Sequence, residues 1–246
     1  DAITGGWQKS DLIVVAARPG MGKSAFVVSA ARNAAIDFQH PVAIFSLEMT
    51  AIQLVTRLLA SEAEIPSDKL RKGDLREDEF QQLNSKIGQL DNASIFIDDT
   101  PALSIFEFCA KARRLKAQHN ISLIIIDYLQ MMVSGQEGRG NREQEVSLIS
   151  RSLKNIAKEL DIPIIAVSQL SRAVELRADK SRRPQLSDLR ESGAIEQDAD
   201  IVMFLYRPEY YHLTEDDEGN PSKGIAEVII AKHRNGRTGT EKLLFI

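Results

Sequence analysis

Lys23 and Ser24 stand together at the end of a glycine-containing loop whose residues, 17–24, read Ala-Arg-Pro-Gly-Met-Gly-Lys-Ser. A β-branched apolar run precedes the loop, and helix-prone residues follow it. A loop of this length between a strand and a helix points successive backbone N–H groups at phosphates, at the positive end of the helix dipole. The lysine supplies charge to the β- and γ-phosphates, and the hydroxyl is a ligand for Mg²⁺. The pattern is a Walker A loop and predicts a nucleoside triphosphate site.

The strict form of this pattern has glycine at the position of Ala17. The loop tolerates the extra methyl group if Ala17 keeps a negative φ. We expect nine consecutive residues to surround the phosphates: Ala17, Arg18, Pro19, Gly20, Met21, Gly22, Lys23, Ser24 and Ala25.

A later apolar run, 123–126, ends in Asp127. An aspartate at the end of a buried strand is a Walker B pattern and holds Mg²⁺ directly or through water. Taken alone, such an aspartate is more often a turn residue, but here a phosphate loop precedes it. We therefore expect Ser24 and Asp127 to be the metal ligands.

The catalytic base must come from another segment. Many nucleotide hydrolases have a glutamate directly after this aspartate, but this chain has Tyr128. The best candidate is Glu48, at the end of the strand expected after the phosphate-loop helix. Its side chain would project beside the γ-phosphate if this strand neighbours the strand before the phosphate loop. The alternative is a first-turn helix residue that the helix dipole favours.

Gln169 follows the apolar run 163–168 and is a third polar group at a strand end. Its amide can bond the γ-phosphate or the attacking water, and loss of that bond on hydrolysis would make Gln169 a switch. The alternative is that it only caps the strand end.

Lys232 and Arg234 lie two residues apart on one face of a strand expected near the C-terminus. Arginine stabilises charge on a transferring phosphoryl group and accelerates known reactions by about 10³–10⁵. Because the hairpin that carries them is an edge element, we expect the pair to serve a neighbouring subunit's nucleotide. Edge strands also use lysine and arginine to block aggregation, and the residues alone leave that alternative open.

These side chains need a sheet to position them, and strand-like apolar runs recur after helical stretches. Continuously apolar strands that alternate with helices indicate an α/β fold with a mostly parallel sheet and helices on both faces. The runs lie at 12–17, 42–47, 94–98, 122–127, 163–168 and 200–206. Strand-like residues at 225–232 and 240–246 flank an Asn-Gly pair, which predicts a C-terminal antiparallel hairpin.

Three segments are expected to be loops. Residues 134–145 and 171–193 follow core strands and emerge at the carboxyl ends, where open α/β sheets bind ligands. The third, 213–224, is acidic and indicates a solvated turn.

Composition bounds the class of protein. The 246 residues, 43% apolar and 27% charged, suit one large α/β domain over 1–246. The net charge of −4 means that any contact with nucleic acid comes from local basic loops. The single cysteine, Cys109, and the absence of a long apolar run predict a soluble cytoplasmic protein with no membrane contact. Because the sequence begins at Asp1 and stops inside a strand-like run, we expect a fragment of a longer protein.

Together the motifs resemble one family over nearly the whole chain. The ordered set looks like the C-terminal motor domain of bacterial replicative DNA helicases of the DnaB type. It comprises 16–24, 45–49 (FSLEM), 126–130 (IDYLQ), 168–170 (SQL), 188–193 (DLRESG), 197–200 (QDAD) and 232–236 (KHRNG).

The resemblance implies a RecA-like core, ATP and Mg²⁺ as cofactors, a homohexameric ring in the full-length protein with ATP at subunit interfaces, and movement along single-stranded DNA. It also implies primase and a helicase loader as partners. The family's roles transfer to the matching positions. Lys23, Ser24 and Asp127 match the phosphate and Mg²⁺ positions, Glu48 the catalytic base, Gln169 the γ-phosphate sensor, Lys232 and Arg234 the pair that reaches the adjacent nucleotide, and Arg190, Glu191 and Gly193 the segment that tracks the DNA backbone.

A purely structural nucleotide-binding module is excluded only if Glu48 is catalytic, and two further functions also stay open at this stage. One is a RecA-like recombinase or regulatory ATPase without unwinding activity, which only a strand-separation assay distinguishes. The other is a small-molecule phosphotransferase, in which Glu48 would activate a hydroxyl and a mobile arginine-bearing lid would close over the substrate. The SLEM, SQL and KHRNG elements have no natural role in such an enzyme.

Overall fold

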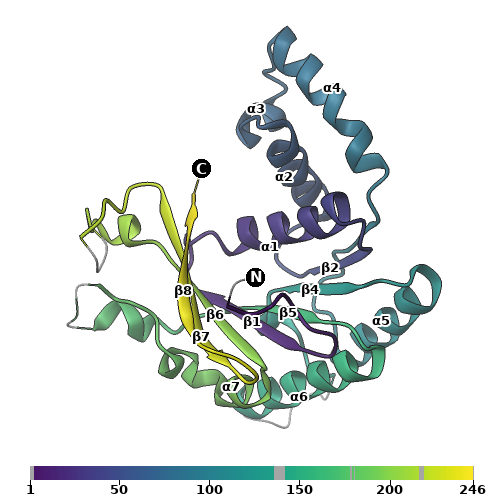
Figure 1. The fold of residues 1–246 in the computed structure, drawn as a ribbon. Coiled ribbons are helices and arrows are strands. Elements are labelled where there is room, and N and C mark those ends of the chain that lie inside the picture. The colour runs from purple at the N-terminus through teal and green to yellow at the C-terminus, as the bar shows by residue number, and fades with distance from the viewer. Residues whose placement is uncertain (1–2, 136–141, 178, 180, 216–218, 246) are drawn as a thin grey trace.

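The structure, a computed structural model, describes residues 3–135, 142–177, 179, 181–215 and 219–245. An eight-stranded sheet with the order β3-β2-β4-β5-β1-β6-β7-β8 forms its centre (Figure 1). The strands are β1 (Leu12–Ala17), β2 (Val42–Ser46), β3 (Ile95–Asp98), β4 (Leu123–Asp127), β5 (Ile164–Gln169), β6 (Ile201–Tyr206), β7 (Ile225–His233) and β8 (Gly239–Leu244). The first six are parallel, and β7 and β8 add an antiparallel hairpin at one edge. The expected strands and hairpin are confirmed.

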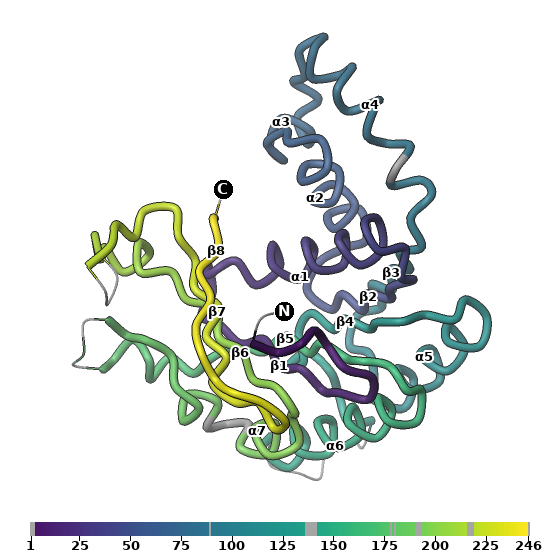
Figure 2. Tube along the Cα trace, in the orientation of Figure 1, coloured from purple at the N-terminus to yellow at the C-terminus, as the bar shows by residue number. Residues whose placement is uncertain are grey.

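The helices cover both faces of the sheet. They are α1 (Lys23–Arg32), α2 (Ala51–Ala63), α3 (Ser67–Lys72), α4 (Glu77–Asp91), α5 (Ile105–His119), α6 (Arg142–Leu160) and α7 (Gly193–Asp198). A π-helical turn, Asn33–Asp37, continues α1, and short 3₁₀ helices occupy Leu129–Met131, Arg172–Leu176, Leu186–Ser192 and Pro208–Tyr211. The chain trace in Figure 2 shows α5 and α6 on one side of the sheet and α1 on the other, with α2, α3 and α4 projecting outward.

Two apolar cores follow from the alternation of side chains along the strands. On one face, Leu12 and Val14 of β1 pack in a buried cluster with residues of α5, α6 and α7. On the other face, Ile13 and Val15 of the same strand pack with residues of α1 and α2. Because every β1 side chain is buried, the strand that leads into the phosphate loop is rigidly held.

Local sequence sets where the two helices after β2 and β3 begin. Thr50 caps α2 by accepting from the backbone N–H of Gln53, and Ser104 caps α5 by accepting from the N–H of Glu107. In both cases the N3 side chain bonds back to the capping residue, which completes a capping box.

Two of the expected loops contain regular structure. Helix α6 begins at Arg142, so residues 142–145 are helical rather than part of a loop, because Val146 starts the stripe of α6 that packs into the core. The segment 171–193 contains two 3₁₀ helices and the first residue of α7. Residues 136–141 and 216–218, in the first and third expected loops, lie outside the described residues. Within the described residues, we find no helix long and apolar enough to cross a membrane.

Candidate nucleotide site

The phosphate loop leaves β1 at Ala17 and enters α1 at Lys23. Ala17 keeps a strand conformation beside Gln169 of β5, so its methyl group is accommodated as expected. Gly20 and Gly22 have φ values of +80° and +93°, which L side chains rarely adopt. The two glycines therefore allow the turn that directs the first N–H groups of α1 toward an anion.

Ser24 and Asp127 meet across two elements. The Ser24 hydroxyl, in the first turn of α1, donates a hydrogen bond of 3.1 Å to Oδ2 of Asp127 at the end of β4. Burial raises the pKa of Asp127, the Ser24 hydrogen bond opposes that rise, and the charge of Glu48 adds to it. The other carboxylate oxygen, Oδ1, is buried and has no hydrogen-bond partner among the described residues. A buried oxygen without a partner beside a hydroxyl oxygen fits a hard cation such as Mg²⁺.

Lys23 brings an ammonium group to the end of the phosphate loop. Its Nζ donates a long hydrogen bond of 3.4 Å to the carbonyl of Ala17. Burial lowers the pKa of the ammonium, and the negative charges of Asp127 and Glu48 oppose that effect. A partly desolvated ammonium with one weak backbone partner is suited to binding a phosphate oxygen.

The charge of Glu48 acts on both Lys23 and Asp127, and Glu48 follows β2, which neighbours β4. The expectation that its strand neighbours the strand before the phosphate loop is wrong, because β4 and β5 lie between β2 and β1. Ser46 pairs with Asp127 in the sheet, and the next N–H, that of Leu47, donates to the Asp127 carbonyl at 2.7 Å. The Ser46 hydroxyl then donates to the carbonyl of Met49 at 2.7 Å, which holds the turn that carries Glu48. Glu48 precedes α2, whose cap is Thr50, so the alternative of a first-turn helix residue is excluded.

The exposed Glu48 side chain lines a cavity of about 720 Å³ bordered by α1, α2 and α3. Arg57 and Arg71 also line this cavity. In the described part of the chain, no group of three or more His, Cys, Asp or Glu residues forms a metal site. A cation here would accordingly need oxygens from a bound phosphate in addition to Ser24 and Asp127.

Gln169 lies at the end of β5, directly beside the first residue of the phosphate loop. The Leu170 N–H donates to the Ala17 carbonyl at 3.2 Å, and the Arg18 guanidinium donates to the Leu170 carbonyl at 2.7 Å. Arg18 is buried and also forms an ion pair of 2.8 Å with Glu175. The phosphate loop and the segment after Gln169 are therefore joined by several contacts.

Lys232 and Arg234 lie at the other end of the sheet. His233, between them, pairs with Ile201, and Ile201 pairs with Ile13, four residues before Ala17. Four strand residues span about 13 Å, so the structure does not bring this pair to the chain's own phosphate loop. The role of the pair at a neighbouring subunit's nucleotide stays a prediction.

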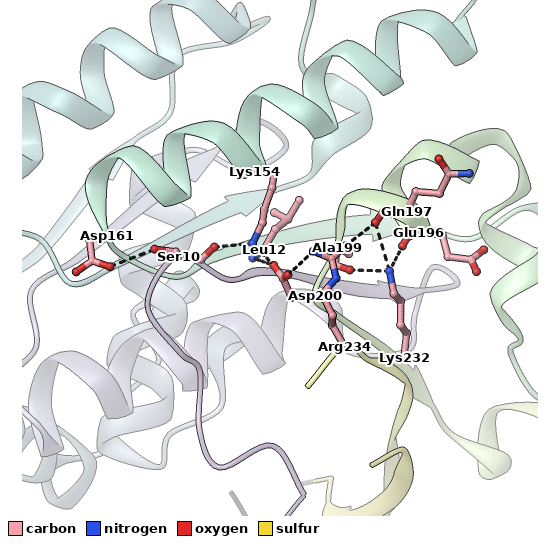
Figure 3. A network of polar contacts seen from close by, with 10 residues as sticks. All are labelled: Ser10, Leu12, Lys154, Asp161, Glu196, Gln197, Ala199, Asp200, Lys232 and Arg234. Atoms are coloured by element: carbon pink, nitrogen blue, oxygen red, sulfur yellow. Dashed lines mark hydrogen bonds and ion pairs between the residues drawn. The ribbon is translucent and has the colours of Figure 1, made fainter. Parts of the chain in front are cut away.

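Both cations bind the end of α7 (Figure 3). Lys232 Nζ donates to the carbonyls of Glu196, Gln197 and Ala199 at 2.5, 3.4 and 2.8 Å. Arg234 donates to the Gln197 carbonyl at 3.0 Å and lies 3.1 Å from the buried Asp200. Burial, together with the charge of Arg234, lowers the pKa of Lys232.

Comparison with known proteins agrees with this geometry. The family model described as "DnaB-like helicase C terminal domain" matches residues 1–246. The replicative DNA helicase DnaC of Bacillus subtilis (strain 168) is 52% identical over 246 residues, which are 100% of this chain and 53% of that protein. The replicative DNA helicase DnaB of Geobacillus stearothermophilus is 53% identical over the same shares.

The chain belongs to the DnaB-like helicase C-terminal domain family. It spans about half the length of the curated relatives it matches. A solved structure of an ATPase domain has a TM-score of 0.91 at 41% identity and covers 100% of this chain and 85% of that one. The structure of a DnaB-like replicative helicase, solved in a study of its interactions with primase, has a TM-score of 0.89 at 41% identity. This match covers 98% of this chain and 56% of that one. The expected fold class is confirmed.

The segment that the family resemblance assigns to DNA is only partly described in this DnaB-like domain. Arg190 and Glu191 lie in the 3₁₀ helix Leu186–Ser192, but their side chains are outside the described residues, and Gly193 begins α7. Asp188 fixes the start of this segment. Its carboxylate accepts from the Gln185 N–H at 2.7 Å and pairs with Arg177.

Sequence reasoning missed three residues beside the phosphate loop, Arg207, Tyr210 and Phe245. A Cβ on Gly20 would lie 2.9 Å from the Tyr210 ring, and one on Gly22 would lie 2.6 Å from the Phe245 ring. The Arg207 guanidinium lies 3.8 Å from the centre of the same Phe245 ring. Nothing in the local sequence marks these positions, because β6, β7 and β8 bring them to the loop only in the folded DnaB-like domain.

Proposed function

We propose that residues 1–246 form a single RecA-like ATPase domain, the motor of a replicative DNA helicase that moves along single-stranded DNA and separates duplex DNA. The observation that carries this proposal is the convergence of Lys23, Ser24, Asp127 and Glu48 at the end of the parallel sheet. The family membership of the chain supports the same function.

In the proposed reaction, ATP binds with its phosphates at the N–H groups of residues 17–25 and its γ-phosphate beside Lys23. Mg²⁺ would be held by Ser24 and by Asp127, whose Oδ1 has no hydrogen-bond partner among the described residues, and would neutralise charge on the phosphates. The exposed Glu48 carboxylate accepts a proton from the attacking water. Gln169, beside Ala17, contacts the γ-phosphate until hydrolysis removes it.

The reaction is completed by a neighbouring copy of this chain. Lys232 and Arg234 lie at the opposite end of the sheet from their own phosphate loop, and a ring with nucleotides at subunit interfaces would place them at the next site. This supports the homohexamer proposed for the full-length protein. Backbone groups of the segment with Arg190, Glu191 and Gly193, repeated around such a ring, would track phosphates without reading sequence. Primase and a helicase loader are the partners that we propose from the family.

Steady-state ATP hydrolysis tests the proposal. It is measured while single-stranded DNA is titrated at several protein concentrations, first with these residues and then with the full-length protein. We expect DNA to stimulate hydrolysis increasingly as concentration rises, because each site needs a neighbour. A full-length protein that hydrolyses ATP without response to DNA would contradict the motor, and one that hydrolyses it without separating strands would favour the RecA-like alternative.

A further inference from the structure

The side-chain amide of Gln130 pairs with the backbone at the end of β5. Its Oε1 accepts from the Gln169 N–H at 3.2 Å, and its Nε2 donates to the Gln169 carbonyl at 3.3 Å. Nε2 also donates to the buried Ser168 hydroxyl at 2.7 Å. One half-buried side chain thus makes three hydrogen bonds to two consecutive residues of the neighbouring strand.

These bonds occur where the sheet ladder stops. The register between β4 and β5 ends at Ile126 and Ala166, whereas that between β1 and β5 continues to Ala17 and Gln169. On its β1 side, Gln169 is therefore held by the phosphate loop. On its β4 side, the Gln130 amide exchanges an N–H and a C=O bond with Gln169, as a paired strand residue would.

The backbone that carries Gln130 is also fixed in place. Leu129, in the same 3₁₀ helix, is completely buried, and the Gln130 carbonyl accepts a hydrogen bond from the Arg142 guanidinium at the start of α6. A small cavity of about 40 Å³ lies between these groups, and Asp188 also lines it. Gln130 therefore connects the strand of Asp127, the strand of Gln169 and the first turn of α6.

We propose that Gln130 is a positioning residue that holds the end of β5 in register with the phosphate loop, so that the exposed Gln169 side chain stays directed at the γ-phosphate. This inference rests on the function proposed above for Gln169. It extends that function, because it names the group that fixes the distance between the proposed sensor and Asp127. A displacement of the sensor of about 1 Å is enough to reduce the rate of a positioned reaction by about 10²-fold.

Two substitutions test whether the hydrogen bonds of the Gln130 amide matter apart from the size of the side chain. Gln130→Glu keeps the shape and the acceptor, but it places a carboxylate oxygen opposite the Gln169 carbonyl and the Ser168 hydroxyl. Gln130→Ala removes all three bonds. The matched control is Gln81→Glu, an exposed isosteric change on α4 at a residue that bonds Glu77.

The experiment is a double-mutant cycle in the full-length protein, with Gln130→Ala, Gln169→Ala and the variant with both changes. We expect each of the two single variants, and Gln130→Glu, to lower kcat for ATP by about 10- to 100-fold. The variant with both changes should stay within about twofold of Gln169→Ala, because a group that acts through Gln169 has no further effect without it. The Gln81→Glu control should match the wild type.

Nucleotide affinities distinguish positioning from general loss of structure. ADP with Mg²⁺ has no γ-phosphate, so its Kd should change by less than about twofold in Gln130→Ala. The Kd of ADP with aluminium fluoride, which fills the γ position, should rise by the same factor as kcat falls. Thermal unfolding of each variant is recorded beside these values.

Each result has one meaning. Additive effects in the cycle, or a loss of ADP affinity equal to the loss of aluminium fluoride complex affinity, would overturn the role of Gln130 and leave the proposed function intact. If Gln169→Ala retains the wild-type kcat, the sensor role fails, and this inference fails with it. If the wild-type protein does not hydrolyse ATP, the proposed function itself is wrong.

Discussion

Arg234 and Asp200 form an ion pair, with 3.1 Å between Nη1 and Oδ1, at the opposite end of the sheet from the phosphate loop. The Asp200 carboxylate is buried and also accepts from the Leu12 N–H and from Lys154 (Figure 3). The side chain of Arg234 is 46% exposed, so its guanidinium is held by the protein and is still accessible from outside. This combination suits a side chain that a neighbouring subunit's nucleotide engages.

Arg234→Ala is expected to abolish ATP hydrolysis while nucleotide binding stays largely intact, because the chain's own phosphate loop is about 13 Å or more away. Turnover and the Kd of a fluorescent ATP analogue are measured on the same preparation. Arg237→Ala, an exposed arginine in the same connection, is the matched control and should keep wild-type turnover.

Mixed oligomers then test whether Arg234 acts across the interface. Subunits with Lys23→Ala retain Arg234, and subunits with Arg234→Ala retain the phosphate loop. If the arginine serves the neighbour, some interfaces in the mixture have both groups, and hydrolysis recovers partially. Retained turnover in Arg234→Ala alone, or no recovery in mixed oligomers, would contradict the role of Arg234 at the neighbouring subunit's nucleotide.

Glu48→Gln is expected to bind ATP with unchanged affinity and to reduce its hydrolysis by about 10²–10⁴-fold, the usual contribution of a general base. The amide fills the same space on the turn after β2 but accepts no proton. Binding is measured by titration and hydrolysis by phosphate release. Glu77→Gln, on the exposed face of α4, is the control, and equal rates in the two variants would contradict the role of Glu48.

The fold was predictable because its strands are continuously apolar and its turns carry local signals. The grouping of the candidate site residues was predictable to the extent that each stands at a strand end or, as Ser24 does, in the first turn of the helix that follows the phosphate loop. Ser24, Glu48, Asp127 and Gln169 each follow or border such a run, and the sheet order brings them together.

The remaining parts of the site depend on contacts between distant segments. The Gln130 amide meets Gln169 across 39 positions of sequence, and no propensity reports that bond. Phe245 reaches Gly22 only because the hairpin folds back beside β6. The start of α6 at Arg142 was missed because residues 142–145 are all polar, like the loop before them.

The pKa of Asp127 gives a pH dependence with a definite sign. Burial raises this pKa above the ordinary value of about 3.9, so the folded protein binds the proton more tightly than the unfolded chain. Without nucleotide, the free energy of unfolding should therefore fall as pH rises from the ordinary value through the raised one. Binding of Mg²⁺ with ATP needs the ionised carboxylate, so the added stability should shrink as pH falls through the raised pKa.

Thermal unfolding with and without ATP and Mg²⁺, recorded from the ordinary aspartate pKa of about 3.9 upward to neutral pH, measures both trends. Asp127→Asn removes the titrating group. The stabilisation that ATP and Mg²⁺ give this variant is subtracted from the wild-type value at each pH, and the difference is the contribution of the Asp127 carboxyl. In Glu48→Gln, the stabilisation by ATP and Mg²⁺ should be lost at a lower pH than in the wild type, because the charge of Glu48 contributes to the raised pKa of Asp127. If the stabilisation by ATP and Mg²⁺ has the same pH dependence in the wild type and in Asp127→Asn, Asp127 does not control metal binding.

Gly22 and Gly73 offer a matched pair for the phosphate loop. Both have positive φ, +93° and +68°, next to a helix. A Cβ at Gly73 meets nothing within 4 Å, whereas one at Gly22 would lie 2.6 Å from the Phe245 ring. Both alanine variants should lose about 1–2 kcal/mol of unfolding free energy from the left-handed conformation, measured in urea. Only Gly22→Ala should also weaken ATP binding, by about tenfold or more, because the methyl group displaces the ring and distorts the N–H groups that face the phosphates. Wild-type ATP affinity in Gly22→Ala would mean that this glycine's conformation does not shape the anion site.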